Sequence, residues 1–321
     1  MAIEHAAVQV VRKPWGVVDL HPWNDIDGSK DPVGELWFQR PDQSAPIPEL
    51  LLKLLFTSEP SSIQVHPDDA FARSVGLQNG KTEAWYILSA TPDARVGLGL
   101  TLHLAPPELR AAIKSGAIAG LVNWCSVKKG DIIFVPAGTI HTIGAGIVLA
   151  EIQQHSDATF RLFDFGRKRE LHEDSAVAVS DAGPIQTQAG PRRLTTVRTA
   201  LVASPHFVLE RVDLPANSTW ALNARRETWI LLIEGRARIG LTNMIVGDTV
   251  FAKTDFSKTD FAKTNPAGIV VGPDGMTALV AYPGPDPVAS LLEESEVHMT
   301  KPVGTSAAPT SKPEEIVGVQ R

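Results

Sequence analysis

The sequence predicts a mainly β protein with two domains, and two observations carry this prediction. The first is length, because 321 residues exceed the roughly 150 of a typical domain. The second is that short apolar or β-branched runs, bounded by turn residues, recur at regular spacing in both halves of the chain. Twenty-five Gly and 24 Pro make up about 15% of the residues, against roughly 12% on average, which favours many turns. Short strands joined by turns predict β-sandwiches or barrels.

Composition and charge exclude several classes of protein. Apolar residues are 43% of the chain, enough to form a core. The single cysteine, Cys125, excludes an intramolecular disulfide and a thiolate zinc site, and it fits a reducing, cytoplasmic setting. We expect no membrane span, because no apolar run approaches roughly 18 residues, and no signal peptide, because basic residues follow the first apolar run. The net charge of −6 argues against a nucleic-acid partner.

The first half contains both predicted helices and the first set of predicted strands. The strand-like runs cover residues 62–66, 84–88, 131–135 and 146–152. Residues 48–56 (PELLLKLLF) fit either a helix or a buried strand. Helices are predicted over 68–75, after Pro67, and from Pro106-Pro107 to a stop at Gly116.

The second half begins after a segment that resembles a linker, residues 181–194, which has few large apolar side chains. The strand-like runs that follow cover 206–213, 227–234, 248–252, 268–272 and 276–282. The prediction is therefore a domain at 1–180, a second at 195–285 and a mostly disordered tail at 286–321. Residues 251–265 repeat a five-residue unit (FAKTD, FSKTD, FAKTN), which favours a duplicated loop over a functional basic hairpin.

One run, GDIIFVPAGTIH at residues 130–141, has the pattern expected of a strand between two tight turns. Gly130 allows the first turn, and Pro136 and Gly138 set the second, so that His141 can be aimed inward from the next strand. The pattern G-x5-P-x-G-x2-H resembles the second signature of the cupin superfamily. In that superfamily the histidine is a metal ligand inside a small β-barrel.

Three upstream residues complete a possible donor set with His141. Gln64 and His66 share one face of a strand because alternate residues do, and Glu83 stands just before the strand-like run AWYIL. Each alone has an ordinary explanation: a backbone partner for Gln64, a helix cap for His66, or a surface position for Glu83. Two imidazoles, a carboxylate and an amide oxygen together suit a divalent cation.

Six separated segments now identify a family resemblance. They are GELW (34–37), LLLKLLF (50–56), SIQVHPDD (62–69), GKTEAWYIL (80–88), the 130–141 run, and AEIQQHSDATFRLFDFGR (150–167). In this order they resemble the type I mannose-6-phosphate isomerases over roughly residues 10–180. The second half resembles that family's more variable C-terminal barrel. The resemblance implies two cupin-like barrels of jelly-roll type with a few short helices.

The resemblance also implies roles for individual residues. The implied ligands of one zinc ion per chain are Gln64, His66, Glu83 and His141. The implied catalytic residues are Arg161, Glu151 and Lys81, and the implied substrate contacts are Ser62, Lys81 and Arg161. The family varies at the first ligand position, where some members have Lys. In the second half, Ile269 to Val271 stand where a ligand histidine would be needed, so we expect a metal-free structural barrel there.

The implied reaction interconverts mannose-6-phosphate and fructose-6-phosphate through a cis-enediol(ate). Removing a proton beside a carbonyl needs a base and a group that stabilises the developing oxyanion. Either Glu151 or a zinc-bound water could be the base. The expected partner is a small sugar phosphate, with no nucleic acid or membrane, and the chain is a monomer or homodimer. The alternatives are another metal-dependent cupin acting on sugars (an epimerase or oxygenase) or a non-catalytic sugar-binding cupin.

Overall fold

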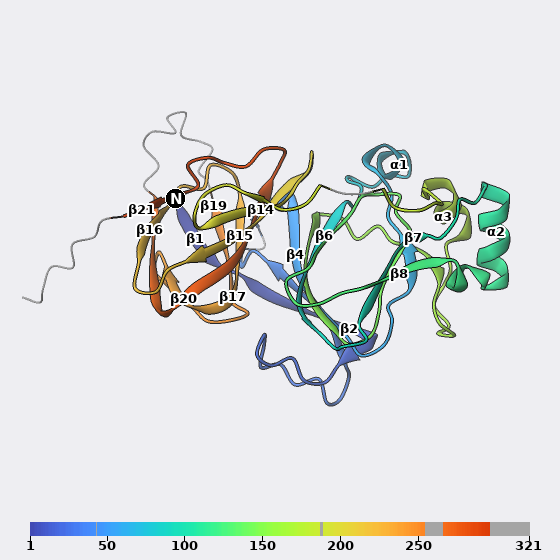
Figure 1. The fold of residues 1–321 in the computed structure, drawn as a ribbon, viewed down its shortest axis with the longest axis horizontal. Helices are drawn as coiled ribbons and strands as arrows, with labels where there is room; N and C mark the ends of the chain where they lie inside the picture. The colour runs from blue at the N-terminus through green and yellow to red at the C-terminus, as the bar shows by residue number, and fades with distance from the viewer. Residues whose placement is uncertain (43, 187–188, 254–265, 296–321) are drawn as a thin grey trace, which may run out of the picture.

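The computed structural model describes residues 1–42, 44–186, 189–253 and 266–295 (Figure 1). Within these ranges the chain forms three antiparallel sheets, three α-helices and one 3-10 helix, which confirms the mainly β class. Residues 254–265, which hold most of the repeat, and 296–321 of the predicted tail lie outside the described residues. None of the described helices has the length and apolarity needed to cross a bilayer.

The first half contains two sheets that face each other. The six-stranded sheet has the order β2 (Ala7–Val17), β3 (Val33–Gln39), β4 (Leu50–Thr57), β11 (Ile147–Gln154), β6 (Glu83–Ala90) and β9 (Ile132–Val135). The five-stranded sheet has the order β12 (Phe160–Phe163), β5 (Ile63–Val65), β10 (His141–Ile143), β7 (Arg95–Leu100) and β8 (Val122–Ser126). Trp85, Leu98 and Ile143 belong to one core cluster, so the two sheets bury a shared interior.

The ambiguous run at 48–56 is a strand, β4, that is buried on both faces. Leu52 and Leu54 face the second half of the chain, and Leu55 faces the interior between the first two sheets. A strand covered on both faces is apolar throughout and shows no alternation, which is why its sequence also fits a helix. Lys53 lies on the same face as Leu55 and is 3% exposed.

Both predicted helices are confirmed. α1 (Asp69–Ser74) is capped by Asp68, which accepts a hydrogen bond from Phe71 N, and α2 (Pro106–Ser115) ends at Gly116 with a φ of 75°. The structure adds a 3-10 helix, η1 (Ala117–Gly120), and a third α-helix, α3 (Glu173–Val179). α2, η1 and α3 contribute to one core cluster with the five-stranded sheet. α3 was missed because it fully buries only Ala176 and therefore has little apolar periodicity.

The second half forms a ten-stranded sheet. Its main path is β1 (Ala2–His5), β19 (Thr249–Lys253), β17 (Thr228–Ile239), β20 (Ala267–Pro283), β15 (Phe207–Leu214), β14 (Arg198–Ala203) and β13 (Arg192–Arg193). Attached to it are β16 (Thr219–Leu222), β18 (Thr242–Met244) and β21 (Leu292–Glu294). The domain boundaries stay predictions, but residues 2–5 pair with β19 and residues 292–294, inside the expected tail, pair with β16.

The runs predicted as two strands at 268–272 and 276–282 are one strand, β20. Its register with β17 shifts between Gly235 and Ala237. A Cβ on Gly235 would lie 2.0 Å from the Gly275 carbonyl oxygen, so only glycine permits the two backbones to approach this closely. A bent strand with glycines at the bend therefore resembles two strands in the sequence.

The two halves meet through a continuous apolar core. The outer face of the six-stranded sheet, including Phe38 and Tyr86, belongs to one cluster with Phe207, Trp229 and Leu279 of the ten-stranded sheet. Trp229 Nε1 also donates a hydrogen bond to the carbonyl oxygen of Leu50 at 3.2 Å. The second half therefore supports one whole face of the sheet that builds the first.

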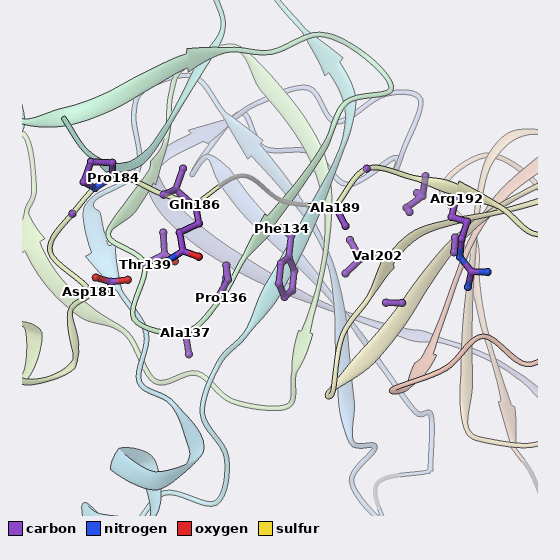
Figure 2. A pocket seen from close by; sticks show the side chains of 16 residues that line it. Phe134, Pro136, Ala137, Thr139, Asp181, Pro184, Gln186, Ala189, Arg192 and Val202 are labelled. Carbon is purple, nitrogen blue, oxygen red and sulfur yellow. The ribbon is translucent and has the colours of Figure 1, made fainter. Parts of the chain in front are cut away.

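The predicted linker follows the surface of the first half. Asp181 forms an isolated β-bridge with Thr139, and Pro184 forms another with Gly99. With β9 and β14, residues of this segment line a cavity of about 580 Å³. Figure 2 shows Asp181 and Arg192 at opposite ends of this cavity, with Phe134, Pro136 and Val202 between them. None of the predicted site residues lines it.

A half-buried carboxyl at the junction gives a prediction for stability. Glu227 Oε1 accepts hydrogen bonds from Glu49 N and Leu50 N at 2.5 and 3.3 Å, and burial raises the pKa of Glu227 to about 7. The folded state therefore holds this proton more tightly than the unfolded state, so stability falls as the pH rises from about 4.5 to about 7. Glu227→Gln keeps an oxygen acceptor and loses the charge.

Near pH 4.5 we expect Glu227→Gln and the wild type to have the same free energy of unfolding. Above pH 7 we expect the value for Glu227→Gln to be higher by about 2 kcal/mol, a figure already reduced because the side chain is partly exposed. Urea unfolding at several pH values measures this difference. Glu234→Gln, at an exposed carboxylate paired with Lys129, is the control. If the free energy of unfolding of Glu227→Gln differed from that of the wild type by the same amount at pH 4.5 and pH 8, the raised pKa of Glu227 would be contradicted.

Candidate metal centre and adjoining pocket

Three of the four predicted metal ligands converge in the interior of the first half. The donor atoms of His66, Glu83 and His141 all lie within 4.8 Å of one another. His66 Nε2 is 3.3 Å from Glu83 Oε2, and His141 Nε2 is 3.5 Å from Glu83 Oε1. None of the three is more than 1% exposed. Together they form a buried group that could hold a metal ion.

Gln64, the fourth predicted ligand, lies beside this group. It stands directly opposite His141 in the ladder between β5 and β10, and its Nε2 is 3.3 Å from His141 Nε2. Its Oε1 accepts a hydrogen bond from Ser62 Oγ at 3.0 Å. The amide would therefore have to turn over to present its oxygen to a metal ion.

Both histidines are oriented by backbone carbonyl groups. His66 Nδ1 donates to the Ala158 carbonyl oxygen at 2.8 Å, and His141 Nδ1 donates to the Thr139 carbonyl oxygen at 2.9 Å. A carbonyl oxygen can only accept, so Nδ1 carries the proton in each ring and Nε2 faces the group as a lone pair. Burial, followed by the Lys81 ammonium, lowers the pKa of His66 to about 4, and burial lowers the pKa of His141. Both rings are thus neutral at pH 7, as metal ligands must be.

Glu83 is held as a carboxylate. Burial alone would raise its pKa, but the Lys81 ammonium holds the pKa of Glu83 well below its usual range. Trp85 Nε1 lies 3.0 Å from Glu83 Oε1 and 3.2 Å from Glu151 Oε2 and donates to both. The Lys81 ammonium donates to Glu83 Oε2 and to His66 Nε2. Lys81 thus contacts two of the atoms that would bind a metal.

A row of alternating charges extends from this group across the six-stranded sheet. Lys13 Nζ lies 3.0 Å from Glu35, Lys53 Nζ lies 3.9 Å from Glu35 and 3.2 Å from Glu151, and Lys81 Nζ lies 3.8 Å from Glu151. Lys53 and Glu151 are directly opposite each other in the ladder between β4 and β11. Sequence reasoning missed Lys13, Glu35 and Lys53. The available signal was a lysine inside the otherwise apolar run LLLKLLF.

The row opens onto a pocket of about 200 Å³. Its cationic lining residues are Lys13, Lys53, Lys81, Arg161 and Arg169, and its carboxylates are Glu35, Glu151 and Asp157. Ser62 and Gln64 also line it, so every predicted catalytic or substrate-contacting residue reaches this pocket. The cations outnumber the carboxylates, although the chain as a whole carries a net charge of −6. The pocket therefore suits an anionic ligand.

Arg161 is a pocket cation with a buried donor that has no partner among the described residues. It lies on β12, opposite Gln64, and its Nη1 donates to the Glu170 carbonyl oxygen at 2.7 Å. Its Nε is buried and has no hydrogen-bond partner among the described residues. Burial, followed by the Arg169 charge, lowers the pKa of Arg161. An anion in the pocket would stabilise the Arg161 charge against both burial and the repulsion from Arg169.

Comparison with known proteins gives relatives of one kind. No protein-family model matches the chain. It is 38% identical over 202 residues to the mannose-6-phosphate isomerase of Streptococcus mutans, covering 60% of this chain and 63% of that protein. It is 34% identical over 221 residues to the mannose-6-phosphate isomerase ManA of Bacillus subtilis, covering 63% and 65%. The matched regions thus span just under two thirds of these relatives' length.

Solved structures of similar fold extend over most of the chain. The mannose 6-phosphate isomerase of Bacillus subtilis superimposes with a TM-score of 0.73 at 24% identity, covering 88% of this chain and all of that one. A phosphomannose isomerase from Salmonella typhimurium gives a TM-score of 0.66 at 15% identity, with the same coverage. A mannose 6-phosphate isomerase solved with zinc and yttrium gives 0.66 at 16%. The fold is that of these isomerases.

Removing one ligand tests the metal group directly. We expect His141→Ala to lose its bound metal, because the remaining donors leave the ion under-coordinated. Metal content measured by mass spectrometry on zinc-loaded, desalted protein is the readout, and His103→Ala, at an exposed histidine, is the control. Equal metal content in the wild type and His141→Ala would contradict the assignment.

Trp85→Phe tests the indole that bridges two carboxylates. It removes the N–H shared by Glu83 and Glu151 and keeps most of the buried ring. Groups that orient a ligand typically contribute 10- to 100-fold to metal affinity, so we expect a loss of about 10-fold in a competition titration against a zinc chelator. Trp15→Phe, in the same core cluster, controls for lost volume and should keep wild-type affinity. Equal losses in both variants would attribute the effect to packing.

Proposed function

We propose that this protein is a zinc-dependent aldose-ketose isomerase that interconverts mannose-6-phosphate and fructose-6-phosphate. The observation that carries the proposal is that a His-Glu-His donor group and a cation-rich pocket share one buried interior. Curated relatives of 34–38% identity that are named mannose-6-phosphate isomerases support this substrate. Two cupin-like barrels, a cytoplasmic location and a monomer or homodimer without nucleic-acid or membrane partners belong to the same proposal.

The donor set fits a zinc ion. Gln64, His66, Glu83 and His141 would hold it, with nitrogen and oxygen donors of the kind zinc prefers. The orientation of both histidines by backbone carbonyl groups supports this assignment, as does a relative of the same fold solved with zinc. When bound, the ion would supply Lewis-acid stabilisation of a developing oxyanion.

The phosphate end of the substrate would be bound by pocket cations. Arg161 offers its guanidinium charge, Ser62 offers a hydroxyl group, and the pocket carries an excess of positive charge. Anchoring the phosphate would orient C1 and C2 of the sugar without participating in the chemistry. This binding energy serves the reaction by fixing the reacting atoms near the base.

Glu151 is the base that the geometry favours. Its carboxylate lines the pocket, and the ammonium groups of Lys53 and Lys81 stabilise its negative charge from 3.2 and 3.8 Å. It would carry the proton between C1 and C2 on one face of the enediolate. Lys81 would serve the second proton transfer, between the two oxygen atoms.

Lys81 cannot contact His66 Nε2 and Glu83 Oε2 while a cation occupies the same donors. Filling the site would turn its ammonium toward Glu151, the next carboxylate in the row. Although burial alone would lower it, Glu151 and Glu83 raise the pKa of Lys81, so it remains charged in either position.

A coupled assay with mannose-6-phosphate tests the proposal. We expect chelation to abolish turnover and zinc to restore it. We expect Arg161→Ala to lower kcat/KM about 100-fold, because a charged substrate contact is lost in a buried pocket. Arg95→Ala, at an exposed arginine stacked on Trp124, should keep the wild-type rate.

Two outcomes would overturn the proposal. Turnover that survives chelation would exclude a metal-dependent isomerase. Conversion of the sugar to a C2 epimer instead of a ketose, measured by NMR of the products, would favour the epimerase alternative.

A further inference from the structure

We infer that His172 is a positioning residue for Arg161, holding the strand end from which the guanidinium enters the pocket. The inference deepens the proposed function and rests on it, because it assigns how this site keeps its anion-binding arginine in place. His172 lies nine residues beyond the end of the strand that it supports and directly before α3.

Arg161 sits on an edge strand. β12 pairs with β5 and ends the five-stranded sheet among the described residues, and Arg161 stands opposite Gln64. Both backbone polar groups of Arg161 are bonded to the segment at 170–172 rather than to β5. In an antiparallel ladder these groups point away from the partner strand at every second residue, so without another contact they would be left to solvent.

His172 takes the place of a neighbouring strand at this one position. Its backbone N–H donates to the Arg161 carbonyl oxygen at 2.8 Å, and its ring Nδ1 accepts from Arg161 N at 3.0 Å. Because a backbone N–H can only donate, Nδ1 must be unprotonated, so the ring carries its proton on Nε2. Burial, followed by the Arg161 charge, lowers the pKa of His172, in agreement with this neutral form.

The same segment also holds the guanidinium. The Glu170 carbonyl oxygen accepts from Arg161 Nη1 at 2.7 Å, on the side chain whose Nε has no partner in the described structure. Residues 170–172 thus fix the backbone and one arm of Arg161 and leave the Nε donor unused. The guanidinium held in this way is the group that we assign to the phosphate.

His172 is itself held on a rigid element. Its carbonyl oxygen accepts from Ala176 N at 2.8 Å in the first turn of α3, and the Phe160 ring packs edge-on against its imidazole at 6.2 Å. Glu173 ties this turn to Arg110 of α2 at 2.6 Å. The imidazole makes no helix-capping hydrogen bond, so replacing it removes no cap from α3.

The chemistry of the contact defines matched variants. The Oδ1 atom of asparagine is as many bonds from the backbone as histidine Nδ1, so His172→Asn keeps an acceptor at the position of Nδ1. His172→Leu keeps the bulk of the side chain and loses the acceptor. His172→Gln keeps polarity but displaces the acceptor, which provides a loss variant that buries no new apolar group.

The test compares zinc-loaded enzymes in the mannose-6-phosphate assay, with zinc content and thermal stability measured in parallel. We expect His172→Leu and His172→Gln to lower kcat/KM about 10- to 100-fold and His172→Asn to stay within about threefold of the wild type. Zinc content should be unchanged in all three. The double variant Arg161→Ala/His172→Leu should be no slower than Arg161→Ala alone, because His172 acts only through Arg161.

Three outcomes would overturn the inference. The first is a wild-type kcat/KM in both His172→Leu and His172→Gln, and the second is a loss in His172→Asn as large as in those two variants. The third is a double variant that is slower than Arg161→Ala by the same factor by which His172→Leu is slower than the wild type. Binding of inorganic phosphate, measured by calorimetry on the same proteins, separates this failure from failure of the proposed function. If the wild type does not convert mannose-6-phosphate, the proposed function is wrong. Weaker phosphate binding by His172→Gln than by His172→Asn would then still support the positioning role, and equal binding would remove it.

Discussion

The site depends on one electrostatic constraint: charges buried between two sheets must neutralise one another. Lys53, Glu151 and Lys81 are each at most 3% exposed, and a lone charge at such a position is strongly disfavoured. The alternation of sign across neighbouring strands satisfies each of them from both sides. The position of each of these three groups is therefore fixed by its charged neighbours.

The opposite face of the same strands gives the second half of the chain a structural role, although no metal ligands are predicted there. Leu52 and Leu54 alternate with Lys53 along β4, and together with Tyr86 they pack in one core cluster with residues of the ten-stranded sheet. A sheet that buries charge on one face needs a large apolar surface on the other to offset the penalty. The second half provides that surface and holds the strands in register, which keeps the donor atoms aligned.

Local sequence rules predicted the residues whose geometry is set within one strand or turn. Alternation placed Ser62, Gln64 and His66 on one side of β5, and the Pro136–Gly138 turn brought His141 to the start of β10. Lys13, Glu35 and Lys53 escaped prediction because their significance comes from pairing between strands far apart in the sequence.

His172 was missed for a related reason. Its partner is the backbone of Arg161, and no pattern of residue types reveals a side chain bonded to a strand edge. The pairing of β1 with β19 is equally invisible locally, because the paired residues are at least 245 positions apart in the sequence.

That pairing has a consequence for how the protein is made. Residues 2–5 leave the ribosome about 245 residues before β19 exists, which at typical elongation rates is a wait of tens of seconds. During that time the first strand has no partner, while β2 to β12 can already assemble. The sheet of the second half therefore includes one strand that is made before all of its other strands, and this strand can pair only after β19 has been made.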